Sequence, residues 1–226
     1  MKVTYYGHSC FGVEIKGKHL LFDPFISPNP LAANIKLEDI KADYILLSHA
    51  HQDHVADAET IAKRTGALLV ANFEICMYYL KLGIKNIRPM STGGSYDAGI
   101  FKVKCVNAIH ASSFEDGTYG GAPNGFVISA DDESFYHAGD TALTYDMKLI
   151  GEDFKLKFAM LPIGDNFTMG TADAIKACNF IGCNNVIAIH YDTFDLIKID
   201  TGKVTHAFEK AGKEIAFIKI GETKEI

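Results

Sequence analysis

Short apolar runs alternate along most of the chain with segments in which apolar residues recur every three or four positions. The runs predict strands and the periodic segments predict helices, because side chains share a strand face every second residue and a helix face every 3.6 residues. Strands are predicted at residues 3–6, 11–16, 19–22, 44–48, 67–71, 86–90, 100–109, 125–130, 134–138, 158–162, 186–189 and 215–218. Helices are predicted at residues 37–40, 57–65, 74–82, 143–150, 171–181 and 204–211.

Turn signals organise these elements into sheets. Gly17-Lys18 and Asp131-Asp132 each separate two predicted strands and indicate tight hairpins. Hairpins near the N-terminus favour a mixed sheet, whereas the later alternation of strand and helix is typical of an α/β fold. With 226 residues, 48% of them hydrophobic, the chain suits one domain spanning residues 1–226. Residues 111–124 are expected to form a Gly-rich loop and a candidate lid.

The densest chemistry lies in the segment His49-Ala50-His51-Gln52-Asp53-His54, directly after the apolar run 44–48. Neutral imidazole and carboxylate groups suit Zn²⁺, and no paired cysteines offer a thiolate site. His49 and His51 stand two apart on an extended segment and can hold one ion together. Asp53 and His54 fall where the pattern becomes helical, so they point elsewhere and predict a second ion. A chance cluster on a solvated loop is the alternative, but it explains poorly the position after a buried strand.

Three further donor residues each stand just beyond a predicted strand, namely His110, Asp140 and His190. This placement is expected to gather them at one rim of the fold. With the first cluster the set contains five histidines and two aspartates. Such a set can hold two ions and still leave coordination positions for water or substrate.

The order of these residues resembles the metallo-β-lactamase superfamily, whose hallmark H-x-H-x-D-H is present at residues 49–54. Four more segments resemble a narrower group of small cytoplasmic metal-dependent hydrolases, similar to the lactonase that acts on phosphorylated ascorbate. They are Tyr6-Gly7-His8-Ser9-Cys10-Phe11, Phe22-Asp23-Pro24-Phe25, Pro162 to Gly170, and His190-Tyr191-Asp192-Thr193-Phe194. The resemblance implies a four-layer αββα sandwich, with two mixed sheets flanked by helices.

The resemblance also implies a ligand set. His49, His51 and His110 would hold one metal, Asp53, His54 and His190 the other, and Asp140 would bridge both. We expect two divalent ions, zinc first, with manganese or iron as alternatives because nitrogen and oxygen ligands do not select one metal. Related di-iron enzymes that reduce oxygen carry Glu at the position of His51, so hydrolysis is favoured here.

Hydrolysis follows from the effect of two cations on water. The pKa of a water molecule held by such ions falls from about 15.7 toward about 7, which supplies hydroxide at neutral pH. We expect attack on an ester-like bond, a lactone or a phosphoester, with Asp53 or Asp140 as the catalytic carboxylate that orients the nucleophile. A phosphodiesterase or nuclease, and a metal-bound sensor or binding module without catalysis, are the alternatives.

Several other residues have two interpretations each. His8 lies beside either the substrate or a metal ligand. Asp23 either accepts the second N–H of a ligating histidine or is an ordinary turn carboxylate before proline. Asn166 and Tyr191 either line the pocket or pack within ordered loops. Cys10 is expected to be a small buried residue, with a place near the site as the alternative.

The remaining histidines have simpler expectations. His137, within a predicted strand, is expected to be a hydrogen-bonded core residue, with a contact to a metal ligand as the alternative. His19 and His206 are expected at the surface.

The net charge indicates which binding partners to expect, and the cysteine content indicates the cellular compartment. The net charge of −6 and the absence of a Lys/Arg cluster argue against nucleic-acid and membrane surfaces, so a small, anionic molecule bound near the cations is expected. Five cysteines without C-x-x-C spacing, and an N-terminus without the pattern of a secretory signal, favour the cytoplasm. A homo-oligomer is compatible with the sequence.

Overall fold

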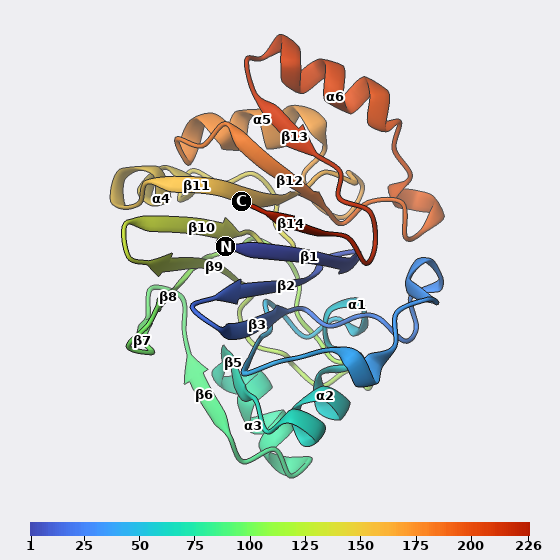
Figure 1. Cartoon of the computed structure of the whole chain (residues 1–226), viewed down its shortest axis with the longest axis vertical. Coiled ribbons are helices and arrows are strands. Elements are labelled where there is room, and N and C mark those ends of the chain that lie inside the picture. Colours follow the sequence, from blue (N-terminus) through green and yellow to red (C-terminus); the bar gives the residue numbers. More distant parts are fainter. The chain divides into compact units, whose positions relative to one another are not determined.

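Two seven-stranded mixed sheets form the framework of the chain in the computed structural model, which describes residues 1–226. This confirms the predicted pair of mixed sheets. Contacts divide the chain into two compact units with one sheet each (Figure 1). Unit 1 contains Met1–Thr92, Ala111–Pro123 and Ile218–Ile226, and unit 2 contains Gly93–His110 and Asn124–Phe217. The single domain spanning residues 1–226 stays a prediction.

The sheet of unit 1 has the strand order β14-β1-β2-β3-β4-β5-β6. Its strands are β1 (Lys2–Gly7), β2 (Cys10–Ile15), β3 (Lys18–Phe22), β4 (Tyr44–Leu46), β5 (Leu68–Asn72), β6 (Ile87–Met90) and β14 (Thr223–Glu225). The pairs from β14 to β3 are antiparallel, and those from β3 to β6 are parallel. Strands β1, β3, β4 and β5 therefore all end at the same edge of this sheet.

The sheet of unit 2 has the order β13-β12-β11-β10-β9-β8-β7. Its strands are β7 (Ser95–Asp97), β8 (Lys102–Asn107), β9 (Asn124–Ala130), β10 (Glu133–His137), β11 (Leu156–Pro162), β12 (Asn185–Ile189) and β13 (Glu214–Ala216). The pairs from β7 to β10 are antiparallel, and those from β10 to β13 are parallel. Strands β8, β10, β11 and β12 consequently end at one edge of this sheet. The prediction that His110, Asp140 and His190 gather beyond strand ends requires this arrangement.

Along the sequence, each helix stands between two strands of its own unit. They are α1 (Gln52–Val55), α2 (Ala58–Thr65), α3 (Phe73–Lys81), α4 (Met147–Asp153), α5 (Thr171–Phe180) and α6 (Thr201–Lys210), with short 3₁₀ turns at Pro30–Ala32, Leu37–Asp39 and Asp195–Ile197. Helix α2 ends at Gly66, whose φ of 70° gives the left-handed cap that glycine adopts without steric cost. None of the helices combines the length and apolar composition of a membrane-spanning segment.

Several predicted boundaries are wrong. The turn between β2 and β3 lies at Lys16-Gly17 rather than at Gly17-Lys18, because both residues have positive φ, as a two-residue hairpin of this type requires. Helix α4 begins at Met147 instead of residue 143, and α6 begins at Thr201, where the Asp200 side chain accepts from the Lys203 amide. The sequence does not predict strands β7 and β14, because each is only three residues long, is mostly polar and contains no apolar run.

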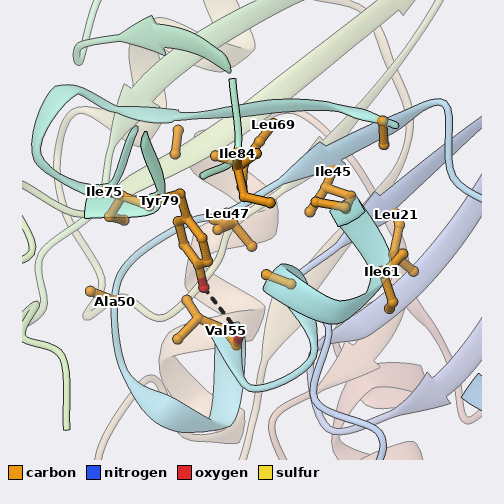
Figure 2. Packing of buried hydrophobic residues seen from close by; sticks show 14 of the residues in the cluster. Leu21, Ile45, Leu47, Ala50, Val55, Ile61, Leu69, Ile75, Tyr79 and Ile84 are labelled. Atoms are coloured by element: carbon orange, nitrogen blue, oxygen red, sulfur yellow. Dashed lines mark hydrogen bonds between the residues drawn. The ribbon is translucent and has the colours of Figure 1, made fainter. Parts of the chain in front are cut away.

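Each unit has its own hydrophobic core. In unit 1 the core gathers the inner faces of β3, β4 and β5 with α2 and α3. Figure 2 shows this packing, in which the hydroxyl of Tyr79 points toward Val55, another residue of the cluster, and donates to its carbonyl at 3.2 Å. In unit 2 the core lies among β10, β11, β12 and helices α4, α5 and α6.

The loop at residues 111–123 is fixed by contacts to the rest of unit 1. The Asn72 side chain donates to the carbonyls of Gly120 and Ala122 at 2.6 and 2.9 Å, and it also accepts from the Ile75 amide at the start of α3. A Cβ at Gly120 would lie 2.3 Å from the Cβ of Ala50, so only glycine fits there. This region, predicted as a candidate lid, is thus anchored at its second half.

We predict that Asn72→Ala lowers the free energy of unfolding by about 2–3 kcal/mol, because it removes a helix cap and two hydrogen bonds. Urea denaturation measures the loss. Asn86→Ala is the matched control, since its side-chain amide also donates to a carbonyl, that of Gly66, but at an exposed position.

The variant Asn72→Asp separates the two roles of the side chain. It keeps the acceptor for the helix cap and turns a carboxylate toward two carbonyl oxygens. We expect it to be at least as unstable as Asn72→Ala. A stability near that of the natural protein would show that Asn72 acts only as a cap.

Candidate metal centre

The candidate donors of unit 1 follow strands that end at one edge of its sheet. His8 follows β1, Asp23 follows β3, and His49 comes three residues after β4. Helix α1 then carries Asp53 and His54. Because β1 and β3 run in the same direction and β4 is parallel to β3, these side chains start from neighbouring strand ends.

The carboxylate of Asp23 is fully buried and is held by several donors. One oxygen accepts from the Ser48 amide at 2.7 Å, and the other accepts from the Ser48 hydroxyl at 2.7 Å and lies 3.0 Å from His54 Nδ1. A buried carboxylate needs such partners to offset its desolvation. Of its two predicted roles, the structure favours the one in which Asp23 orients a histidine.

This network assigns the tautomers of two imidazoles. The carboxylate of Asp23 only accepts, so His54 donates from Nδ1 and presents the lone pair of Nε2. The single hydroxyl proton of Ser48 goes to Asp23, so its oxygen accepts from His49 Nδ1, which lies 2.9 Å away. His49 therefore also presents Nε2. A ligating histidine is oriented in this way when its other nitrogen has a fixed partner.

Sequence reasoning missed Ser48. The signal that could have identified it is a hydroxyl residue directly before a candidate ligand, at the end of a buried strand.

The imidazoles of His8, His49, His51 and His54, all in unit 1, pack against one another. The ring centroid of His49 lies 4.1 Å from that of His54 and 4.6 Å from that of His51. His49 Nε2 is 3.0 Å from His51 Nδ1. His8 Nε2 lies 3.1 Å from an oxygen of Asp53, and the ligand atoms of His8, Asp53 and His54 are within 4.8 Å of one another. The Asp53 side chain keeps 25% of its area exposed, whereas that of His8 is fully buried. Unit 1 thus brings together all of its predicted donors.

The three donors of unit 2 also converge. His110 follows β8, Asp140 follows β10, and His190 directly follows β12, so all three leave the same edge of the sheet. His190 Nε2 lies 2.9 Å from Asp140 Oδ2, and His110 Nε2 lies 3.6 Å from the same oxygen. Asp140 and His190 are buried, while the His110 side chain is 14% exposed.

Backbone strain marks three residues that are candidate metal ligands or contact one. His8, Asp23 and His190 have φ values of 55°, 44° and 55°, in the left-handed region that costs a non-glycine residue about 1 kcal/mol or more. Gly164 shows how tightly the segment at His190 is packed, because a Cβ there would lie 2.1 Å from the His190 carbonyl oxygen.

Asn166 and Tyr191 stand in different surroundings. Asn166 is exposed and lies on the wall of a cavity of about 660 Å³ in unit 2, which is also lined by Gly164, Lys198 and Lys203. Tyr191 packs its ring edge-on against Phe217, with centroids 5.3 Å apart, at the margin of the core. The roles of Asn166 and Tyr191 toward a substrate stay predictions.

The three histidines outside the predicted site have different surroundings. His137 is buried, and its Nδ1 accepts from the Gly139 amide at 3.2 Å, as a hydrogen-bonded core histidine does. His206 is exposed on α6, and His19 is half-buried within β3. Cys10 is buried in the core of unit 1, and burial raises the pKa of its thiol well above the ordinary value, so it is a neutral, unreactive thiol.

The donor set fits divalent metal ions. It consists of imidazole nitrogens and carboxylate oxygens, and two imidazoles are held with a lone pair on Nε2. Neutral rings are required, because protonated His49 and His54 at this spacing would repel each other in a buried site. Nitrogen and oxygen donors suit zinc, and they also suit manganese and iron.

Comparison with known proteins agrees with this chemistry. Residues 2–190 match the family model described as the beta-lactamase superfamily domain, so the chain belongs to that superfamily. It is 54% identical over 226 residues to a UPF0173 metal-dependent hydrolase of Flavobacterium johnsoniae, and all of both chains is covered. The protein is therefore a member of the UPF0173 metal-dependent hydrolases.

Solved structures confirm the fold. The chain resembles Igni18, a metallo hydrolase from the archaeon Ignicoccus hospitalis, with a TM-score of 0.89 and 34% identity over 100% of this chain and 98% of that one. It also resembles YhfI of Bacillus subtilis, described as a metallo-beta-lactamase fold protein. That match has a TM-score of 0.75 at 17% identity and covers 99% of this chain and 98% of the other. The metallo-β-lactamase fold expected from the sequence is therefore confirmed.

We predict that Ser48→Ala weakens metal binding by roughly ten- to a hundredfold, because His49 loses the acceptor that fixes its proton on Nδ1. Competition with a chelator measures the affinity. In the metal-free protein, ¹⁵N NMR of the ring should show one His49 tautomer in the natural chain and a mixture in the variant.

The control for this experiment is Ser27→Ala. It removes another Ser–Asp hydrogen bond of unit 1, at 2.5 Å to Asp57, which touches no candidate donor. Equal metal affinities for the two variants would show that Ser48 does not position His49.

Proposed function

We propose that the protein is a binuclear metal-dependent hydrolase that cleaves an ester-like bond, a lactone or a phosphoester, in a small anionic molecule. Its chemistry would be similar to that of the lactonase acting on phosphorylated ascorbate. Zinc is the first candidate metal, with manganese or iron as alternatives. The observation that carries the proposal is the donor geometry within each unit, with His49 Nε2 3.0 Å from His51 Nδ1 and His190 Nε2 2.9 Å from Asp140 Oδ2.

The proposed ligands follow the superfamily resemblance. His49, His51 and His110 would hold one ion, Asp53, His54 and His190 the other, and Asp140 both. When bound, such ions lower the pKa of a coordinated water and polarise the substrate oxygen.

The chain's own groups would handle the proton. Asp53 is the most exposed carboxylate of the set, and His8 lies 3.1 Å from one of its oxygens, which fixes the direction of that carboxylate. Its other oxygen can accept a proton from the attacking water and deliver it to the leaving group. Asp140 is buried beside two imidazoles, which orients it but leaves it less access to solvent.

The cavity of about 660 Å³ in unit 2 has a volume within the range of small-molecule pockets, but none of its lining residues is a proposed metal ligand. Lys198 and Lys203 line it together with Asp165 and Asp200, and each lysine also has an aspartate partner, at 2.7 and 3.4 Å. A cytoplasmic location is part of the proposal, supported by five buried, reduced cysteines. The net charge of −6 supports a small substrate over a nucleic acid, and a homo-oligomer fits the proposal.

We predict two metal ions per chain by elemental analysis of the metal-saturated protein. His110→Ala should reduce this to about one, because the three-histidine position loses a ligand. His206→Ala is the matched control, since that histidine is exposed and should leave both ions in place. A single ion in the saturated natural chain would rule out the binuclear proposal.

We also predict hydrolysis of at least one compound in a screen of lactones, phosphodiesters and thioesters with the metal-loaded protein. Asp140→Ala should lower the rate by about a hundredfold or more, since it removes a metal ligand and the anchor of His190. Asp132→Ala, in the exposed turn between β9 and β10, is the control.

The outcomes of this screen separate the alternatives. Equal rates in the natural chain and Asp140→Ala would contradict metal-dependent catalysis. Activity restricted to oligonucleotides would favour a nuclease. Metal binding without turnover of any compound would favour a sensor or binding module.

A further inference from the structure

A second cavity, of about 380 Å³, lies wholly within unit 1. Its walls come from α1, α2, α3 and the loop at residues 111–123. The volume lies within the range of small-molecule sites. Gln52 and Val55, on the same short helix as Asp53 and His54, contribute to it, so it adjoins the segment that carries candidate metal ligands.

Three aromatic side chains line this cavity. Tyr78 and Phe114 both line the cavity and stack nearly parallel, with centroids 3.6 Å apart and planes at 13°. Tyr79 lines it as well and is held in place by its hydrogen bond to Val55, visible in Figure 2. Phe114 comes from the anchored loop, so the ring stack joins that loop to α3.

The charged residues of the lining are all acidic, namely Glu59, Glu115 and Asp116. The Thr118 amide donates to Asp116 at 2.8 Å and lowers the pKa of that carboxyl, which is therefore ionised at neutral pH. Lys63 pairs with Glu59 at 2.5 Å, so the unbalanced negative charge lies at the other two carboxylates. Burial raises the pKa of the Tyr78 hydroxyl, and the charges of Asp116 and Glu59 raise it further, which indicates a negative potential at this wall.

We propose that this cavity binds an organic cation, a small molecule with an alkylammonium or quaternary ammonium group. The faces of Tyr78 and Phe114 that are not stacked on each other can attract a cation through the ring quadrupole, and the carboxylates add charge complementarity. The apolar part of the lining, which includes Val55 and Leu82, suits the carbon atoms of such a group. A hydrated inorganic cation would gain little from these walls. This inference does not depend on the hydrolytic function.

The test is a binding titration of the full-length, metal-loaded protein with choline and with its neutral isostere 3,3-dimethyl-1-butanol. The quaternary nitrogen has no lone pair, so it cannot ligate a metal, and the hydroxyl is common to both compounds. We expect choline to bind roughly tenfold more tightly. Amide shifts in NMR spectra should concentrate at Glu59, Tyr78, Phe114 and Asp116.

Variants locate the site. The double variant Glu115→Gln, Asp116→Asn should weaken choline binding about three- to tenfold, and the carboxamide introduced at position 116 retains an oxygen that can accept from the Thr118 amide. Asp97→Asn is the matched control. Asp97 accepts from the Gly99 amide at 2.8 Å in the same kind of turn, but it lies in unit 2 outside the cavity.

Tyr78→Leu removes one ring and should also weaken choline binding, by about three- to tenfold, while the neutral isostere loses less. Equal binding of the two compounds, amide shifts at other residues, or unchanged choline affinity in the double variant would each overturn the proposal. The double variant changes only exposed carboxylates and is expected to fold normally. It therefore tests the proposal even if the Tyr78→Leu variant misfolds.

Discussion

The fully buried carboxylate of Asp23 is the constraint on which the first half of the site depends. An ionised group at this depth is tolerated only with a full set of hydrogen-bond donors. Those donors are the amide and hydroxyl of Ser48, from the neighbouring strand end, and the ring of His54, from α1. Satisfying one charge at the end of β3 therefore also fixes the orientation of two imidazoles, His54 directly and His49 through Ser48.

The sheet framework and the placement of the donors could be predicted from the sequence. His49, His110 and His190 each follow an apolar run, and within each sheet the carboxyl ends of strands that run in the same direction meet at one edge of that sheet. The prediction succeeded because both signals are local: a period of two or 3.6 residues, and a polar donor where the period ends. It failed for β7 and β14, which gain their order from pairing with β8 and β1 rather than from their own pattern.

The remaining parts of the site depend on contacts between segments far apart in the chain. The role of Ser48 follows from its position opposite Asp23, and nothing in the local sequence reveals which acceptor its single proton has. The second cavity depends on two contacts of the loop at residues 111–123. Phe114 of this loop stacks on Tyr78, and the Asn72 side chain holds the loop at Gly120. A Gly-rich segment gives no such information, which is why it was predicted as a candidate lid rather than as a fixed wall.

The residues with a strained backbone fall into two groups, those in hairpin turns and those in segments that carry candidate site residues. Lys16 and Asp131 have positive φ in hairpin turns, where any residue that accepts the conformation serves. The other six non-glycine residues with positive φ are His8, Asp23, Asp165, Asn166, His190 and Asp192, in the segments that follow β1, β3, β11 and β12. Glycine would remove the strain at each of them, yet it would also remove the side chain. For Asp23 and His190 the contacts made by that side chain offset the cost, which is the pattern expected where strain persists for function.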